Sequence, residues 1–238
     1  MADAHRLPRE ALTAIAAQVG AFISHRPDGD RSWWTATAGE RALPVLGESF
    51  QIWALGPSAA HSIRHGLRGI HPDQRLIEFM ENTGHWHHQV RTRGGKAVAF
   101  VHSLRSIDKR RRERWTVEAV RASPVAPAID RAIERIDQAE AEKPRPGLVR
   151  LLVIPGFSIH ALWLEAPDGD RVLVAHQGKG RSKLSAGRFY GGYEFLAALA
   201  RRAGTGTGVA AEEASRALPK TRPKKQPPRS PRGKARRR

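Results

Sequence analysis

Three histidines in the stretch 85–103 combine a residue type and a spacing suited to a metal site. The stretch reads HWHHQVRTRGGKAVAFVHS, two strand-like runs around a Gly-Gly pair at 94–95. A two-residue glycine loop would place His87 directly opposite His102, and alternation along the strand would put His85 on the same face. Neutral imidazole binds zinc, iron, nickel and copper. His85, His87 and His102 are therefore candidate ligands of a divalent transition metal.

Packing and surface polarity offer another explanation of the same histidines. Aromatic and imidazole rings fit sheet faces well, and a one-residue change in the turn would separate His87 from His102. No acid stands out as a general base, although Glu81 is the closest in sequence. The leading expectation is a protein without a cofactor, and a metal-dependent enzyme built on this hairpin is the alternative.

Ser158 raises a different chemistry, that of a hydrolase with a serine nucleophile. An exposed nucleophile turn needs G-x-S-x-G between a strand and a helix, but here the segment reads GFSIH and His160 takes the second glycine position. The residues that follow alternate up to PDGD at 167–170, which is typical of a hairpin. We expect a bend in which Ser158 bonds its own backbone. A serine hydrolase at Ser158 is the third-ranked function.

Positive charge is concentrated at the C-terminal end of the sequence. The whole chain has 41 Lys and Arg against 23 Asp and Glu, and residues 219–238 hold ten of these basic residues, five prolines and no acid. Such a segment cannot bury enough apolar surface to fold alone, so it is predicted to be a disordered tail suited to phosphate backbones. Its basic residues are Lys220, Arg222, Lys224, Lys225, Arg229, Arg232, Lys234, Arg236, Arg237 and Arg238.

A second basic segment, 105–114, precedes Trp115. It contains Arg110, Arg111 and Arg112 in succession, and these would extend a surface for nucleic acid. The alternative is an ordinary solvated loop. No aromatic residues are interleaved with the tail for base stacking, so we expect binding without sequence preference to nucleic acid or another polyanion. A purely solubilising or targeting tail is the competing interpretation, and a membrane partner is not expected.

Composition narrows the remaining classes of protein. The absence of cysteine excludes disulfides, thiolate metal sites and cysteine nucleophiles. No export signal and no apolar stretch of membrane-spanning length are found, so a cytoplasmic location is expected. The leading function is a non-enzymatic accessory or binding protein that contacts nucleic acid through its basic tail.

The elements that would position these residues mix helices and strands in clusters without regular βαβ alternation. This pattern predicts an α+β fold, a mixed or antiparallel sheet built from short hairpins and packed against several amphipathic helices. Helices are expected at 8–23, 57–67, 72–82, after 123–124 and at 193–202; strands are expected at 32–37, 42–46, 50–55, on both arms of 85–103, around 115–119, and at 148–154, 159–164 and 171–175.

The predicted domain organisation is one globular domain over residues 1–203. KPRPG at 143–147 is a candidate boundary between two lobes, 204–218 is expected to be a linker with a short helix, and 219–238 is the tail. The segments 96–103 and 171–177 both run from apolar residues into a histidine. A duplicated unit is one interpretation of this likeness, and two independent hairpins are the other. The oligomeric state is left open.

Overall fold

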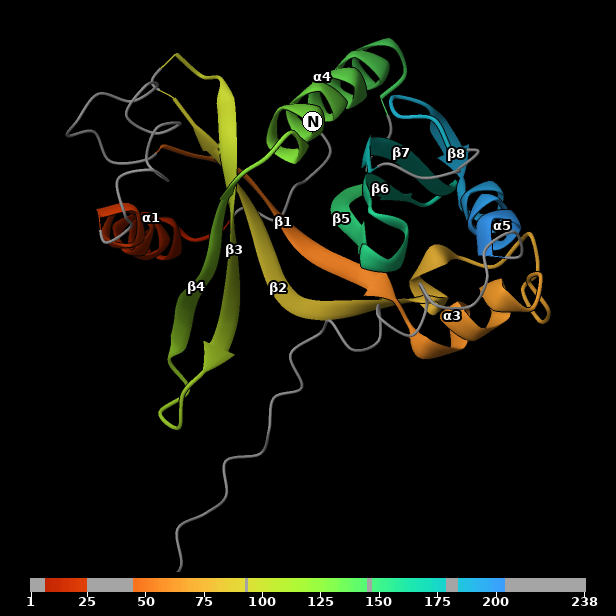
Figure 1. Ribbon diagram of the computed structural model, residues 1–238, viewed down its shortest axis with the longest axis horizontal. Coiled ribbons are helices and arrows are strands. Elements are labelled where there is room, and N and C mark those ends of the chain that lie inside the picture. The colour runs from red at the N-terminus through yellow and green to blue at the C-terminus, as the bar shows by residue number, and fades with distance from the viewer. Residues whose placement is uncertain (1–6, 25–44, 93, 145–146, 179–183, 204–238) are drawn as a thin grey trace, which may run out of the picture.

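The computed structural model describes residues 7–24, 45–92, 94–144, 147–178 and 184–203, which form a mixed sheet with helices on both faces (Figure 1). The basic tail, the linker and the strand expected at 32–37 lie outside these residues. In the described part of the chain, the sheet has eight strands in the order β4-β3-β2-β1-β5-β6-β7-β8. The α+β class expected from the sequence is therefore confirmed.

The described elements follow one another along the chain as strands interrupted by helices. The strands are β1 (Val45–Leu55), β2 (Met80–Arg91), β3 (Ala97–Ile107), β4 (Glu113–Ala122), β5 (Leu148–Ile154), β6 (Ile159–Ala166), β7 (Gly169–Gln177) and β8 (Phe189–Gly191). The helices are α1 (Arg9–Ser24), α3 (Pro57–Arg64), α4 (Val125–Glu142) and α5 (Gly192–Ala203), with short 3-10 turns η2 (Leu76–Glu78) and η3 (Pro155–Phe157).

Two antiparallel meanders start side by side at the centre of the sheet and run outward. β1 and β5 are parallel and join through the pairs Ile52–Leu151 and Trp53–Leu152. From there β1 leads through β2 and β3 to β4, and β5 leads through β6 and β7 to β8. A helix follows each meander, α4 after β4 and α5 after β8. The two segments with the apolar-to-histidine likeness correspond to β3 and β7, the third strand of each meander.

The two faces of the sheet carry different helices. α4 covers one face, where Ile129 packs with Phe50 and Leu151. On the opposite face, α5 packs over Trp163 from one meander, and α1 packs over Trp86 from the other. Because α4 contacts β3 as well as β6 and β7, it bridges strands from before and after the 143–147 segment.

The helix expected over 72–82 is wrong. This segment forms only the turn η2 before β2 begins at Met80. The backbone N–H of Leu76 donates to Asp170 Oδ2 at 2.6 Å, and Met80 pairs with Leu55 in the sheet. The apolar pattern predicted a helix locally, but these pairings with distant residues draw the backbone into a turn and a strand. Among the described helices, none is long and apolar enough to cross a membrane.

Candidate functional sites: a histidine row and a basic hairpin

The register predicted for the first histidine hairpin is confirmed, although its turn is not the expected one. His87 pairs with His102 across β2 and β3. The connecting loop is one residue longer than a two-residue turn, because the N–H of Thr92 donates to the carbonyl of Lys96. An irregularity next to the turn leaves Val98 without a β2 partner, and this extra residue restores the register. The two imidazoles lie close together, with His87 Nδ1 3.3 Å from His102 Nε2.

His85 lies two residues along the same face, but both of its ring nitrogens have other partners. Its Nε2 is 3.0 Å from Glu118 Oε2 on β4, and its Nδ1 is 3.0 Å from the carbonyl of Thr83. A metal ligand needs a free lone pair, so His85 would have to break one of these contacts first. The structure therefore brings His87 and His102 together and places His85 in separate contacts with Glu118 and Thr83.

His88 points to the opposite face of β2 and has a structural role. Its Nδ1 lies 2.8 Å from Ser49 Oγ, and its Nε2 lies 2.7 Å from Ser103 Oγ. Burial, with a smaller effect of the His102 charge, lowers the pKa of His88 to about 3. Its ring is neutral in the folded protein and joins three neighbouring strands through hydroxyl groups.

A second pair of histidines comes from the other meander, and sequence reasoning missed it. His160 on β6 pairs with His176 on β7, and their ring centroids are 6.1 Å apart. His160 Nδ1 is buried and has no hydrogen-bond partner among the described residues. The positive charge that His160 would carry lowers the pKa values of both His87 and His102, which places it within electrostatic reach of the first pair. The shared apolar-to-histidine pattern of 96–103 and 171–177 was the available signal.

Burial keeps the imidazoles of His87, His102 and His160 neutral. It is the largest cause that lowers the pKa of His87 well below its usual value and the pKa values of His102 and His160 to about 4. The nearby Arg121 also lowers the pKa of His102. Within the described residues, no group of three or more His, Asp or Glu side chains is already arranged around a metal position. The imidazoles of His87, His102 and His160 are thus neutral and can supply nitrogen lone pairs, and those of His87 and His102 lie next to each other.

Ser158 occupies a bend, as expected, with its backbone in the left-handed region at φ 52°. Its N–H donates to the carbonyl of Pro155, and its own carbonyl accepts from Gly178. Its side chain makes no hydrogen bond to a histidine in the part of the chain that the structure describes. A serine nucleophile needs a base beside its hydroxyl, and this arrangement does not provide one.

The segment 105–114 forms the end of the long β3–β4 hairpin, which extends past α1 in Figure 1. Its turn is organised by Asp108, whose Oδ1 accepts the N–H groups of Arg110 at 2.7 Å and Arg112 at 3.0 Å. The N–H of Arg112 in particular lowers the pKa of Asp108. Arg111 takes a positive φ of 58° at the end of the turn. The carboxylate thus shapes a loop that presents basic side chains.

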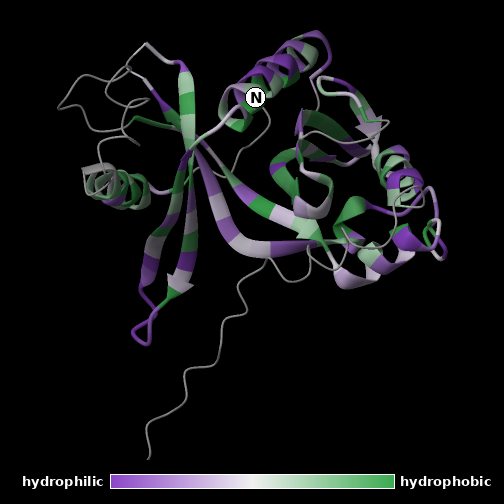
Figure 2. Cartoon of the chain, in the orientation of Figure 1, coloured by the Kyte–Doolittle hydropathy of each residue, from purple (hydrophilic) through white to green (hydrophobic). Residues whose placement is uncertain are grey.

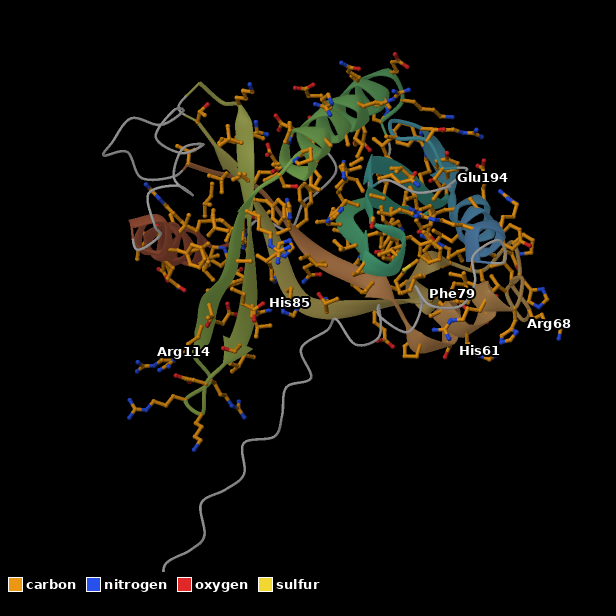
Figure 3. All side chains as sticks on the ribbon, viewed as in Figure 1. His61, Arg68, Phe79, His85, Arg114 and Glu194 are labelled. Atoms are coloured by element: carbon orange, nitrogen blue, oxygen red, sulfur yellow. The ribbon has the colours of Figure 1, made fainter. Side chains whose placement is uncertain are left out.

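Four cations at this tip are free of ion pairs within the described residues. Arg105 pairs with Glu113, and Arg114 lies 3.5 Å from Asp108. The unpaired cations are Lys109, Arg110, Arg111 and Arg112, all exposed. Figure 2 shows the tip as a hydrophilic end of the sheet, and Figure 3 shows Arg114 on the β4 arm of the hairpin, next to this tip.

Comparisons with protein-family models, with curated proteins and with solved structures found no match for this chain.

Proposed function

We propose that this protein binds nucleic acid through electrostatic contacts, using the tip of the β3–β4 hairpin together with the basic tail at 219–238. The carrying observation is the exposure of Lys109, Arg110, Arg111 and Arg112 on one projecting turn without carboxylate partners among the described residues. Segment 105–114 has six basic and two acidic residues, a net charge of +4. Phosphate backbones attract such a cluster and release counterions when it binds.

The kind of contact follows from the residue types at the tip. Arginine and lysine bind phosphate oxygens, which positions a protein on nucleic acid without reading base sequence. The tip segment 105–114 contains no aromatic residue on which an unpaired base could stack. These features support binding with little sequence preference and with strong sensitivity to salt.

The test is a salt titration of binding to a fluorescent 30-base-pair DNA duplex, measured by anisotropy. The tip variant changes Lys109, Arg110 and Arg112 to Gln and Arg111 to Asn, because Asn tolerates the left-handed backbone. If all four cations contact phosphates, the slope of log K against log salt should become shallower by about 3 to 4. Deletion of 219–238 should make it shallower again.

A matched control removes the same number of charges elsewhere. The control variant changes Arg9, Arg68, Arg131 and Arg135 to Gln, all exposed and located on or beside helices. It should keep most of the wild-type salt slope if the tip is the contact surface. Equal losses in the tip and control variants would show that only net charge matters. No binding by the full chain at low salt would reject the function itself.

A single substitution probes the tip in the opposite direction. Asp108→Asn keeps an oxygen that can accept the N–H groups of Arg110 and Arg112, but it removes the negative charge next to the cations. Binding to the duplex should tighten by a few-fold at low salt, with no gain at high salt. Weaker binding would mean that the carboxylate itself is needed.

A further inference from the structure

Ile107 is a large apolar side chain that the fold leaves in solvent. It is 65% exposed, against 47% for Val45 and 36% for Ile77, the other exposed large hydrophobic side chains among the described residues. It belongs to none of the three hydrophobic clusters in this part of the chain. A single exposed apolar residue is common on protein surfaces, so its significance depends on where it lies.

Ile107 lies on a two-stranded ribbon that leaves the rest of the sheet. β3 pairs with β2 as far as Leu104, opposite His85, and continues to Ile107 paired with β4. Residues 105–107 on β3 and 113–114 on β4 are all exposed. Because successive side chains of a strand point to opposite faces, both faces of this ribbon are open to solvent. A ribbon of this width can enter a groove of duplex DNA.

Positive side chains surround Ile107 at the end of this ribbon. The four unpaired cations of the tip follow it within five residues, on a turn closed by the N–H of Asp108, which donates to the carbonyl of Arg112 at 2.9 Å. Across the ribbon Ile107 pairs with Glu113, whose carboxylate is bound by Arg105. The acid opposite Ile107 is thus already neutralised, and an anion that approaches this end of the ribbon meets net positive charge.

An aliphatic side chain among cations has a specific counterpart in duplex DNA. Phosphate contacts explain the lysine and arginines, but an aliphatic group gains free energy only by burial against an apolar surface. In the minor groove, the flat faces of the base pairs provide such a surface where a stacked step opens. Architectural DNA-binding proteins insert an aliphatic wedge at such a step and thereby kink the duplex.

We propose that the ligand of the hairpin is bendable duplex DNA and that Ile107 is a wedge that opens a base step from the minor groove, an inference that rests on the electrostatic binding proposed above. The tip cations hold the phosphates beside the opened step, and the duplex bends toward the major groove. Pyrimidine–purine steps open most easily, so the hairpin favours flexible DNA without reading base edges.

The test measures bending separately from binding. A 20-base-pair DNA duplex with a central TA step carries a donor and an acceptor dye at its ends, and energy transfer is read at low salt with the full chain at saturation. The wild-type chain should raise the transfer, as expected for a bend of about 20–90°. Ile107→Thr keeps a β-branched side chain but makes it polar, and it should saturate the duplex with transfer near that of free DNA.

A mismatched duplex measures the cost of opening the step. A central T·T mismatch is already partly unstacked, so the wild-type chain should bind it roughly tenfold tighter than the fully paired duplex. Ile107→Thr should bind the two duplexes equally well. Its salt slope should stay that of the wild type, because the substitution removes no charge.

Matched variants separate the wedge from apolar exposure in general. Val45→Thr and Ile77→Thr change the two other exposed large hydrophobic residues, and both variants should bend the duplex like the wild type. Ile107→Leu keeps an aliphatic group of the same volume and should bend the duplex as well. Urea denaturation should give all four variants the stability of the wild type, as expected for exposed positions.

The outcomes distinguish this inference from the function on which it rests. Binding with a steep salt slope but without bending, or equal bending by the wild type and Ile107→Thr, overturns the wedge and leaves the electrostatic function intact. Weaker binding by Ile107→Thr to a duplex that the wild type does not bend would place Ile107 against thymine methyl groups in the major groove and also overturn the wedge. A wild-type dimer that Ile107→Thr converts to a monomer would assign the residue to a protein contact instead. No binding to any duplex rejects the function and the wedge together.

Discussion

Strand β3 carries basic side chains into two opposite environments. His102, in its buried part, has a pKa of about 4, mainly because burial opposes its charge. Past the end of β3, Arg110, Arg111 and Arg112 are exposed and charged. The comparison shows that solvent access, and not residue class, decides whether a basic side chain supplies a charge or a lone pair. A charge suits phosphate, whereas a lone pair suits a metal ion.

The largest expected effect is a loss of stability in acid from the buried histidines. The pKa of His88 is about 3, and those of His102 and His160 are about 4, below the ordinary value of 6.5. Below about pH 6.5 the unfolded chain therefore binds more protons than the folded chain does. The free energy of unfolding has its highest value above that pH and falls as the pH drops toward 4. One group shifted this far contributes roughly 3 kcal/mol.

Urea denaturation of the metal-free chain at a series of pH values from 7 to about 4 measures this loss. The His102→Gln variant should show a flatter pH dependence than the wild type, since one of the depressed groups is gone. A Lys109→Gln variant at the exposed tip should leave the profile unchanged. A urea midpoint that stays constant down to pH 4 would mean that the imidazoles are not desolvated.

The next effect contrasts a buried carboxylate with an exposed one. Asp170 accepts hydrogen bonds from Arg75, from the N–H of Leu76 and from Trp163 Nε1. Burial raises the pKa of Asp170, but these donors outweigh it and lower the pKa overall. Asp170→Asn should destabilise the fold by about 1–3 kcal/mol, the cost of leaving buried donors without their charged acceptor, measured by urea denaturation.

Glu113→Gln is the exposed counterpart. Glu113 pairs with Arg105 on the hairpin, where both side chains are about 40% exposed (42% and 43%). Solvent screens such a pair, so the loss should stay below about 1 kcal/mol in the same assay. If the two substitutions had equal effects, the distinction between the buried and exposed parts of the sheet would not hold.

The smallest effect on stability is expected at the binding surface itself. Neutralising Lys109, Arg110, Arg111 and Arg112 breaks no ion pair among the described residues. The free energy of unfolding, measured by urea denaturation, should therefore change by no more than about 0.5 kcal/mol per substitution. The same variant should lose much of its nucleic-acid affinity. A large loss of stability would assign the tip a structural role in place of a binding role.

Much of the local structure was predictable from residue patterns. Helical spacing of apolar residues correctly indicated α1, α3, α4 and α5, and the alternating runs indicated the hairpins. The pairing of His87 with His102 was predicted correctly but for another reason, because a loop one residue longer and the unpaired Val98 offset each other. These features depend on neighbours along the chain, where turn chemistry and side-chain periodicity act directly.

The partners of the histidines were not predictable in the same way. His160 entered the sequence argument only as an obstacle to a serine nucleophile at Ser158, and its proximity to the first pair depends on two separate meanders sharing one face. The false helix over 72–82 has the same origin, because Leu76 is tied to Asp170, 94 residues away. Pairings at that sequence distance leave no local signature.

The sequence by itself determined most of the local elements and the +18 charge with its concentration in the tail. Only the tertiary structure decided which basic groups are desolvated, which are free to meet phosphate, and which imidazoles lie near one another. The physical reason is that periodicity, turns and net charge are properties of adjacent residues. Desolvation and ligand geometry depend on what the rest of the chain places around a side chain.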